Sequence, residues 1–193
     1  MNPTHESQSV VGLKLTGQVL RVLAGVALLT ASAKIQVPFW PVPMTLQVAA
    51  IMLLAASYGL RMGTLTMLTY LAVGAAGLPV FAGTPEKGIG LVYMLGGTGG
   101  YLAGFLAMTI IVGFAADRLP KLAILPAMGL GLVALYALGL GWLAQLVPGD
   151  KLLAYGFTPF IAGDLVKTIL AAILFLGAPK ALMAKLRGTD LNV

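Results

Sequence analysis

Long apolar runs follow one another along the chain, separated by short stretches that hold most of its charges and prolines. A helix needs about 20 mostly apolar residues to cross the hydrocarbon core of a bilayer. Runs of about that length predict six membrane-spanning helices, at roughly 15–33, 44–60, 62–80, 92–116, 121–146 and 158–178. We therefore expect an all-α integral membrane bundle, a single transmembrane domain over residues 1–193 with a polar cytoplasmic tail at 1–14.

The composition supports a membrane protein. Hydrophobic residues make up 59% of the chain and charged residues 9%, whereas soluble domains contain about 25% charged residues. The chain has no cysteine and one histidine, His5 in the polar N-terminal region. A disulfide framework and a thiolate or histidine metal site are therefore excluded. The polar start of the chain lacks a basic region before a short apolar core, so no cleavable signal peptide is expected.

The basic residues fall mainly on one side of the predicted spans. The N-terminal side holds Lys14, Arg21, Arg61, Arg118, Lys121, Lys180, Lys185 and Arg187; the other side holds Lys34, Lys87 and Lys151. By the positive-inside rule, this asymmetry predicts that both termini are cytoplasmic. The membrane we expect is the cell's inner (plasma) membrane. The second and third spans are joined so closely, at Gly59–Gly63, that we expect an antiparallel hairpin.

Two charges interrupt the last apolar run, "FIAGDLVKTIL" at 160–170. Asp164 and Lys167 are three residues apart, which places them on one helix face and in the outer half of the span. Ionisable side chains inside a membrane are costly, so both should face the bundle interior. Together they suit a small ligand with a carboxylate for the lysine and N–H donors for the aspartate. The alternatives are a purely structural ion pair and a lysine that reaches outwards to water.

A glycine-rich stretch, "GGTGGYLAGF" at 96–105, opens the fourth span. Gly96, Gly100 and Gly104 are four residues apart, a spacing typical of closely packed membrane helices. Alternatively, the backbone at the head of this span lines a binding site, with Tyr93 one turn further out as its wall or as an interfacial residue. The candidate lining residues are Gly97, Thr98, Gly99 and Gly100.

The loop before the second span is rich in proline and aromatic residues, "VPFWPVPMTLQ" at 37–47. A loop stiffened by prolines loses little entropy when it closes, which suits a lid over a site. Thr45 and Gln47 add neutral polar groups at the same outer level, while the aromatic residues could equally be ordinary interfacial ones. The lid candidates are Pro38, Phe39, Trp40, Pro41 and Pro43.

Small residues also mark the first span. Ala27 and Ala31 are four residues apart, a pattern that serves either packing within the bundle or docking of another membrane protein. No serine or cysteine has a histidine base, no cluster of carboxylates is evident, and the chain has no ATP-binding loop. We therefore expect neither an enzyme nor a cofactor, and energy from ATP would have to come from a partner.

Three of these segments, in this order, resemble the BioY family: "KIQVPFWPVPMTLQ" at 34–47, "LGGTGGYLAGF" at 95–105 and "GDLVKTIL" at 163–170. The resemblance covers roughly residues 15–185. It implies the substrate-binding component of an energy-coupling-factor (ECF) biotin transporter, which binds biotin with high affinity in an outward-facing cavity. The family pattern usually has a proline where Gly97 stands. No arginine occurs in 81–99 to assist the ligand carboxylate, which leaves Lys87 as the candidate replacement.

The resemblance also implies roles for particular residues. Asp164 would bind the ureido group of biotin and Lys167 its carboxylate end, with Tyr93 and Gly97–Gly100 lining the pocket and the 37–45 loop as the lid. The implied partners are a transmembrane coupling protein, which would contact Ala27 and Ala31, and ATP-binding subunits; a homo-oligomer is a further alternative. A self-sufficient channel or secondary transporter for a carboxylated vitamin is the competing hypothesis. It would need a continuous polar path, whereas the inner halves of the spans hold few polar groups.

Overall fold

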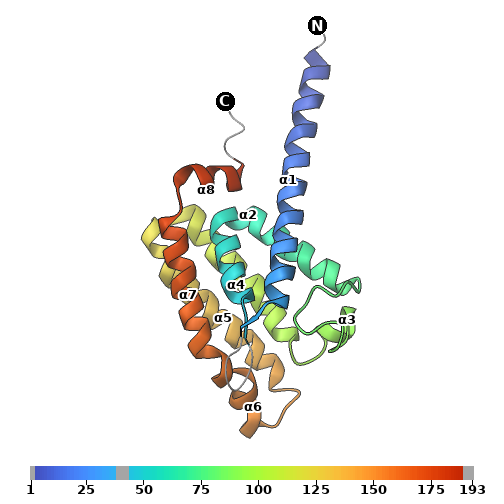
Figure 1. Ribbon diagram of the computed structural model, residues 1–193, viewed down its shortest axis with the longest axis vertical. Helices are drawn as coiled ribbons and strands as arrows, with labels where there is room; N and C mark the ends of the chain where they lie inside the picture. The colour runs from blue at the N-terminus through green and yellow to red at the C-terminus, as the bar shows by residue number, and fades with distance from the viewer. Residues whose placement is uncertain (1–2, 38–43, 189–193) are drawn as a thin grey trace.

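The computed structural model describes residues 3–37 and 44–188, with side chains described for 15–35 and 44–188. This part of the chain is almost entirely helical (Figure 1). Two short antiparallel strands, β1 (Gln36–Val37) and β2 (Met44–Thr45), are the exception. Five helical segments are long and apolar enough to cross a membrane, and they contain helices α1 (Pro3–Lys34), α2 (Gln47–Ala75), α4 (Gly99–Arg118), α5 (Ile124–Leu143) and α7 (Thr158–Gly177).

Helix α4 lies at the centre of the bundle, where it packs most extensively against α2 and α5. Small residues allow this approach: a Cβ atom added to Gly104 would lie 2.8 Å from the Cα atom of Leu135 in α5. Helix α7 packs against α2 and α5, whereas α1 packs mainly against α2 and leaves one face largely exposed. The outward faces are apolar, as helices surrounded by lipid require, and leucines such as Leu20 and Leu174 are exposed there.

The predicted junction between the second and third spans, at Gly59–Gly63, coincides with a break in α2. Two helical segments of α2 (Gln47–Ala75) meet at Gly59, whose φ of 74° and ψ of −177° are not helical (Figure 1). The Asp117 carboxylate occupies the place where a Cβ atom on Gly59 would be, and it accepts a 2.8 Å hydrogen bond from the Leu60 amide. Glycine and this carboxylate together form the close junction between the two segments.

Several helix boundaries also differ from the prediction. Helix α1 begins at Pro3 rather than near residue 15. The predicted span 92–116 is divided into α3 (Gly90–Met94) and α4, and the indole N–H of Trp142 donates to the Gly96 carbonyl in the break. A 3₁₀ turn, η1 (Lys121–Ala123), precedes α5. Two short helices were not predicted, α6 (Gly149–Gly156) and α8 (Lys180–Arg187).

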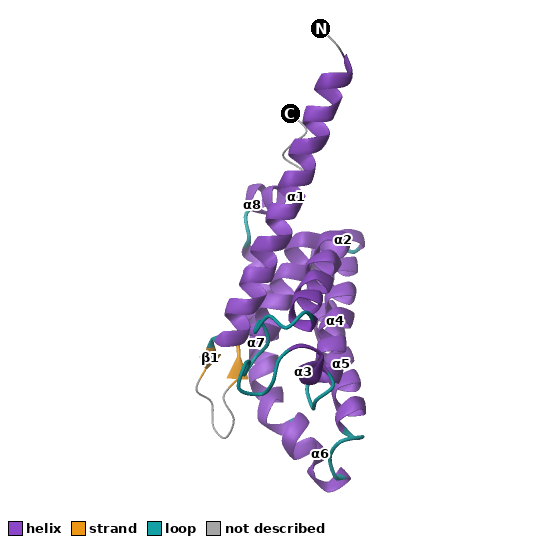
Figure 2. Cartoon of the chain, turned by 90° about the vertical axis from the view of Figure 1, so that its right-hand side faces the viewer, coloured by secondary structure: helices purple, strands orange, loops and turns teal. Residues whose placement is uncertain are grey.

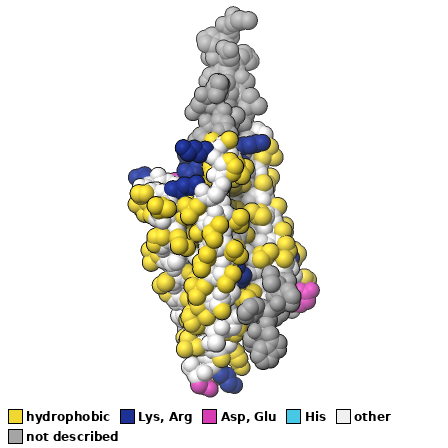
Figure 3. Space-filling view, turned by 60° about the vertical axis from the view of Figure 1, so that its left-hand side comes forward, with side chains coloured by type: hydrophobic (Ala, Val, Ile, Leu, Met, Phe, Trp, Pro, Cys, Tyr) yellow, Lys and Arg dark blue, Asp and Glu magenta, His cyan; other side chains and the backbone are white. Residues whose placement is uncertain are grey.

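The two ends of the bundle differ in charge. Lysines and arginines gather at the end where α1 leaves the bundle (Figure 3). There α8 is anchored by Arg187, which pairs with Asp117 at 3.2 Å and donates to the carbonyls of Ala56 and Ala116. The other end carries β1, α3 and α6 (Figure 2). We call these the cationic end and the cavity end, since the latter holds the site described next.

Candidate ligand-binding site

A cavity of about 390 Å³ lies at the cavity end of the bundle. Ligand sites for small organic molecules typically have volumes of about 300–1,000 Å³, with mostly apolar walls and a few placed polar groups. The wall is formed by helices α2 to α7, by β2, by the loop 76–89 between α2 and α3, and by the turn between α3 and α4. Aromatic rings dominate it: Phe81, Tyr93, Tyr101, Phe105, Tyr136, Tyr155 and Phe160.

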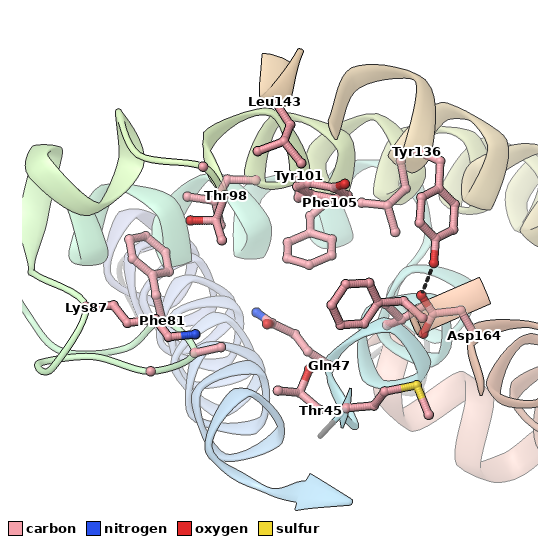
Figure 4. A pocket seen from close by; sticks show the side chains of 18 of the residues that line it. Thr45, Gln47, Phe81, Lys87, Thr98, Tyr101, Phe105, Tyr136, Leu143 and Asp164 are labelled. Carbon is pink, nitrogen blue, oxygen red and sulfur yellow. Dashed lines mark hydrogen bonds between the residues drawn. The ribbon is translucent and has the colours of Figure 1, made fainter. Parts of the chain in front are cut away.

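Asp164 and Lys167 form a buried ion pair in the wall contributed by α7. The Lys167 ammonium lies 2.9 Å from Asp164 Oδ1, and the side chains are 11% and 7% exposed respectively. The Tyr136 hydroxyl of α5 donates to Asp164 Oδ2 at 2.8 Å (Figure 4). A carboxylate has about four lone-pair sites, so each oxygen of Asp164 keeps acceptor capacity. This end of the cavity can therefore receive N–H donors from a ligand.

Lys87 lies across the cavity from Asp164, on the same side as Phe81 and Thr98 (Figure 4). It belongs to the loop 76–89, where its amide donates to the Gly83 carbonyl at 2.8 Å. Its side chain forms no ion pair with any residue in 15–35 or 44–188. The cavity thus has an acceptor at one end and an available cation at the other, which suits an elongated ligand with an acid group.

Gln47 extends into the middle of the cavity, near Thr45 (Figure 4). Its amide nitrogen donates to the Tyr70 hydroxyl at 2.9 Å, and Tyr70 in turn donates to the Val80 carbonyl at 3.0 Å. The residue is buried, with 4% of its surface exposed. One N–H of the Gln47 amide is used by Tyr70, which leaves its second N–H and its carbonyl oxygen for a ligand.

The structure brings most of the sequence-predicted ligand residues to this cavity. Those on the lining are Thr45, Gln47, Lys87, Tyr93, Gly97, Thr98, Asp164 and Lys167. Gly99 and Gly100 are not among them, since α5 closes over both: a Cβ atom on Gly100 would collide with the Leu138 carbonyl and Trp142. Gly100 packs against α5, in line with the packing alternative given for Gly96, Gly100 and Gly104, while Gly99 lies against the Met94 carbonyl and Trp142.

The remaining predictions concern residues away from the described lining. The lid candidates Pro38, Phe39, Trp40, Pro41 and Pro43 lie outside the described residues. Ala27 and Ala31 are exposed on α1, so their side chains are accessible for docking.

Sequence reasoning missed most of the aromatic wall, including Phe81, Tyr101, Phe105 and Tyr136. Rings within apolar runs look the same whether they face a cavity, the core or lipid. Tyr136 carried one usable signal, because a tyrosine in the middle of an apolar span needs a partner for its hydroxyl. That partner is Asp164.

Comparisons with known proteins agree with this architecture. The chain is 39% identical over 164 residues to the "Biotin transporter BioY" of Thermotoga maritima, covering 84% of this chain and 96% of the relative. It is 38% identical over 157 residues to the "Probable biotin transporter BioY" of Pyrococcus horikoshii, covering 81% and 93%. The crystal structure of the S-component for biotin from an ECF-type ABC transporter has the same fold, with a TM-score of 0.67 at 24% identity, covering 91% of this chain and 92% of the other. The model of the BioY family matches residues 4–184, and the chain belongs to this family.

Proposed function

We propose that this protein takes up biotin, as the membrane-embedded, biotin-binding component of an ECF-type vitamin transporter. Membership of the BioY family and the names of the relatives support the substrate. The observation that carries the proposal is the cavity itself, with a hydrogen-bonded carboxylate at one end and, at the other, a cation that has no ion pair among the described side chains. Biotin has matching groups, a ureido ring with two N–H donors and a carboxylate at the end of an apolar chain.

The geometry suggests a modified assignment of the polar residues. Lys167 is bound to Asp164 at 2.9 Å, so the two charges act at the same end of the ligand. We assign the ureido N–H groups to Asp164 and the ureido carbonyl to Lys167. The biotin carboxylate then falls to Lys87 across the cavity (Figure 4), and the aromatic wall packs against the rings and the chain.

The proposed topology has six membrane crossings, both termini in the cytoplasm and the cavity open to the outside of the plasma membrane. Two features support it. The bend at Gly59 divides α2 into two segments that follow different directions (Figure 1), so that α2 can supply two crossings. Cations gather at the end that holds α8 and the start of α1 (Figure 3), which is the side that the positive-inside rule assigns to the cytoplasm.

We propose a transmembrane coupling protein and ATP-binding subunits as partners, because the chain's fold is that of an ECF-type S-component. The exposed Ala27 and Ala31 on α1 are the proposed contact with the coupling protein. The loop that contains Pro38 and Trp40 is the proposed lid over the cavity. ATP would be bound by the partners only.

Biotin binding by the purified protein tests the proposal. Isothermal titration should give a Kd at or below the micromolar range. Hydrogen bonds to charged groups contribute about 1.5–3 kcal/mol, so Asp164→Asn and Lys87→Met should each raise the Kd by about 10- to 100-fold. Lys151→Met is the matched control, because Lys151 is exposed on α6 at the same end and does not line the cavity.

Two results would count against the proposal. A wild-type protein that does not bind biotin would refute the substrate. Proteoliposomes that contain this chain alone and accumulate biotin down its gradient would favour a self-sufficient transporter over a component that needs ATP-binding partners.

A further inference from the structure

One wall of the cavity is a loop without secondary structure of its own. Residues 76–89 connect α2 to α3 and contribute Phe81, Ala82, Gly83 and Lys87 to the lining. Connecting segments are usually more mobile than the elements that they join. A cation on such a loop positions a ligand well only if the loop is held in place.

Three side chains from three different helices hold this loop by its backbone. The Lys34 ammonium, at the end of α1, donates to the Thr84 carbonyl at 2.5 Å and to its hydroxyl at 2.8 Å. Tyr70 of α2 donates to the Val80 carbonyl at 3.0 Å. Tyr93 of α3 donates to the Ala82 carbonyl at 2.8 Å. The three acceptor residues lie within five positions of one another, immediately before Lys87.

An aromatic cluster strengthens the same attachment. The Phe81 ring is 1% exposed and lies between Tyr70 and Tyr93. Its centroid is 5.4 Å from that of Tyr70, edge to face, and 5.1 Å from that of Tyr93 in a stacked arrangement. Gly74 leaves room for the ring, because a Cβ atom there would collide with it. Tyr70 and Tyr93 therefore hold the loop by packing as well as by hydrogen bonds.

Tyr70 makes a second contact that links the loop to the centre of the cavity. Its hydroxyl accepts the Gln47 amide at 2.9 Å while donating to Val80. Tyr70 is fully buried and does not itself line the cavity. One hydroxyl thus fixes both the orientation of Gln47 and the position of the loop that carries Lys87.

We propose that Lys34, Tyr70 and Tyr93 form a clamp that holds the loop 76–89 in its ligand-ready position, and that Tyr70 and Lys34 are positioning residues for the carboxylate end of the ligand. The inference rests on the proposed biotin binding. Neither Tyr70 nor Lys34 lines the cavity. They act through Lys87. Because they hold the loop in place before the ligand arrives, none of the binding free energy is spent on ordering it.

The test compares two ligands, biotin and its neutral carboxamide, in the wild type and in the Tyr70→Phe and Lys34→Met variants. Phenylalanine keeps the ring that packs on Phe81 and removes only the hydroxyl. Lys34 is exposed, so Lys34→Met should fold. Lys34→Met should raise the Kd for biotin by about tenfold and the Kd for the carboxamide by much less. Tyr70→Phe also releases Gln47, so it should weaken both ligands, and biotin more than the carboxamide. The preference for the acid over the amide should therefore shrink towards that of Lys87→Met.

Two controls separate positioning from general damage to the fold. Tyr58→Phe removes another α2 hydroxyl, which donates to the Arg21 carbonyl away from the cavity, and it should leave both affinities unchanged. In a Lys87→Met background, Lys34→Met should have little further effect on biotin, because Lys34 contacts the loop at Thr84 and acts on the ligand only through Lys87.

The outcomes distinguish this inference from the proposed function. Wild-type protein that does not bind biotin would refute the function. If the wild type binds biotin but both clamp variants keep its preference for the acid over the amide, the clamp is overturned and the function stands. The same holds if Lys34→Met weakens both ligands equally.

Discussion

The buried pair of Asp164 and Lys167 can be tested as a structural element and as a binding element in one set of variants. The two side chains are 7% and 11% exposed and lie 2.9 Å apart. Removing one partner from a buried ion pair typically costs about 3–5 kcal/mol, because the other charge is left uncompensated. Lys167→Met should therefore lower the free energy of unfolding by about that amount. The buried Asp164 carboxylate would then keep its hydrogen bond from the Tyr136 hydroxyl but lose the cation that balances its charge.

The double variant Asp164→Asn/Lys167→Met carries no charge at the pair and should recover most of this loss. Its new amide can still accept from Tyr136, and the methionine fills the space of the lysine stem. At about 2–4 °C per kcal/mol for domains of this size, the single variant should unfold roughly 6–20 °C below the wild type. The double variant should fall between the two. Thermal unfolding in detergent, followed by tryptophan fluorescence, measures the three midpoints.

Biotin titration of the same three proteins completes the experiment. The double variant should be stable and yet fail to bind biotin with the wild-type affinity, because the ureido N–H groups have lost their anionic acceptor. A double variant no more stable than Lys167→Met would refute the ion-pair energetics. A double variant that binds biotin as the wild type does would show that the pair is structural only.

Other predictions concern single contacts. Tyr136→Phe removes the hydroxyl that orients the acceptor carboxylate, and a titration should show biotin affinity about 5- to 10-fold lower; an unchanged Kd would contradict the role. Gly104→Val places side-chain atoms against Leu135, and the thermal midpoint should fall sharply, whereas a wild-type midpoint would mean that the α4–α5 contact is looser than described. Arg187→Ala breaks the pair with Asp117 and should lower the midpoint without changing biotin affinity; weaker binding would link the two ends of the bundle.

The long helices could be predicted because crossing a bilayer leaves a strong pattern. A span must be apolar over about 20 residues, whatever it packs against. Their ends could not be predicted as well. The junction at Gly59 was anticipated, but its contact with the Asp117 carboxylate was not, because Asp117 is distant in the sequence. Helices α6 and α8 are too short to appear as apolar runs.

Site residues could be predicted from the sequence only where a polar or charged side chain is energetically costly inside an apolar span. Asp164 and Lys167 stand out because charges are expensive in an apolar span, and Gln47 because it is polar at the start of one. The rings of Phe81 and Phe105 cost nothing in any apolar setting, so their sequence positions do not show that they face a cavity. The spacing of Gly100 and Gly104 favoured close helix packing, but only the structure shows that the partner is α5.

The geometry also changes how the two buried charges are understood. As a sequence pattern, an aspartate and a lysine three residues apart suggested one group for each end of a ligand. In the structure they bind each other at one end of the cavity, and Tyr136 completes the arrangement. Lys167 then serves to pair with Asp164 and orient it inside an apolar bundle, where a charged group needs a partner. A second cation is needed at the far end for an acidic ligand, and Lys87, held on its loop by backbone contacts to three helices, is the residue in position to supply it.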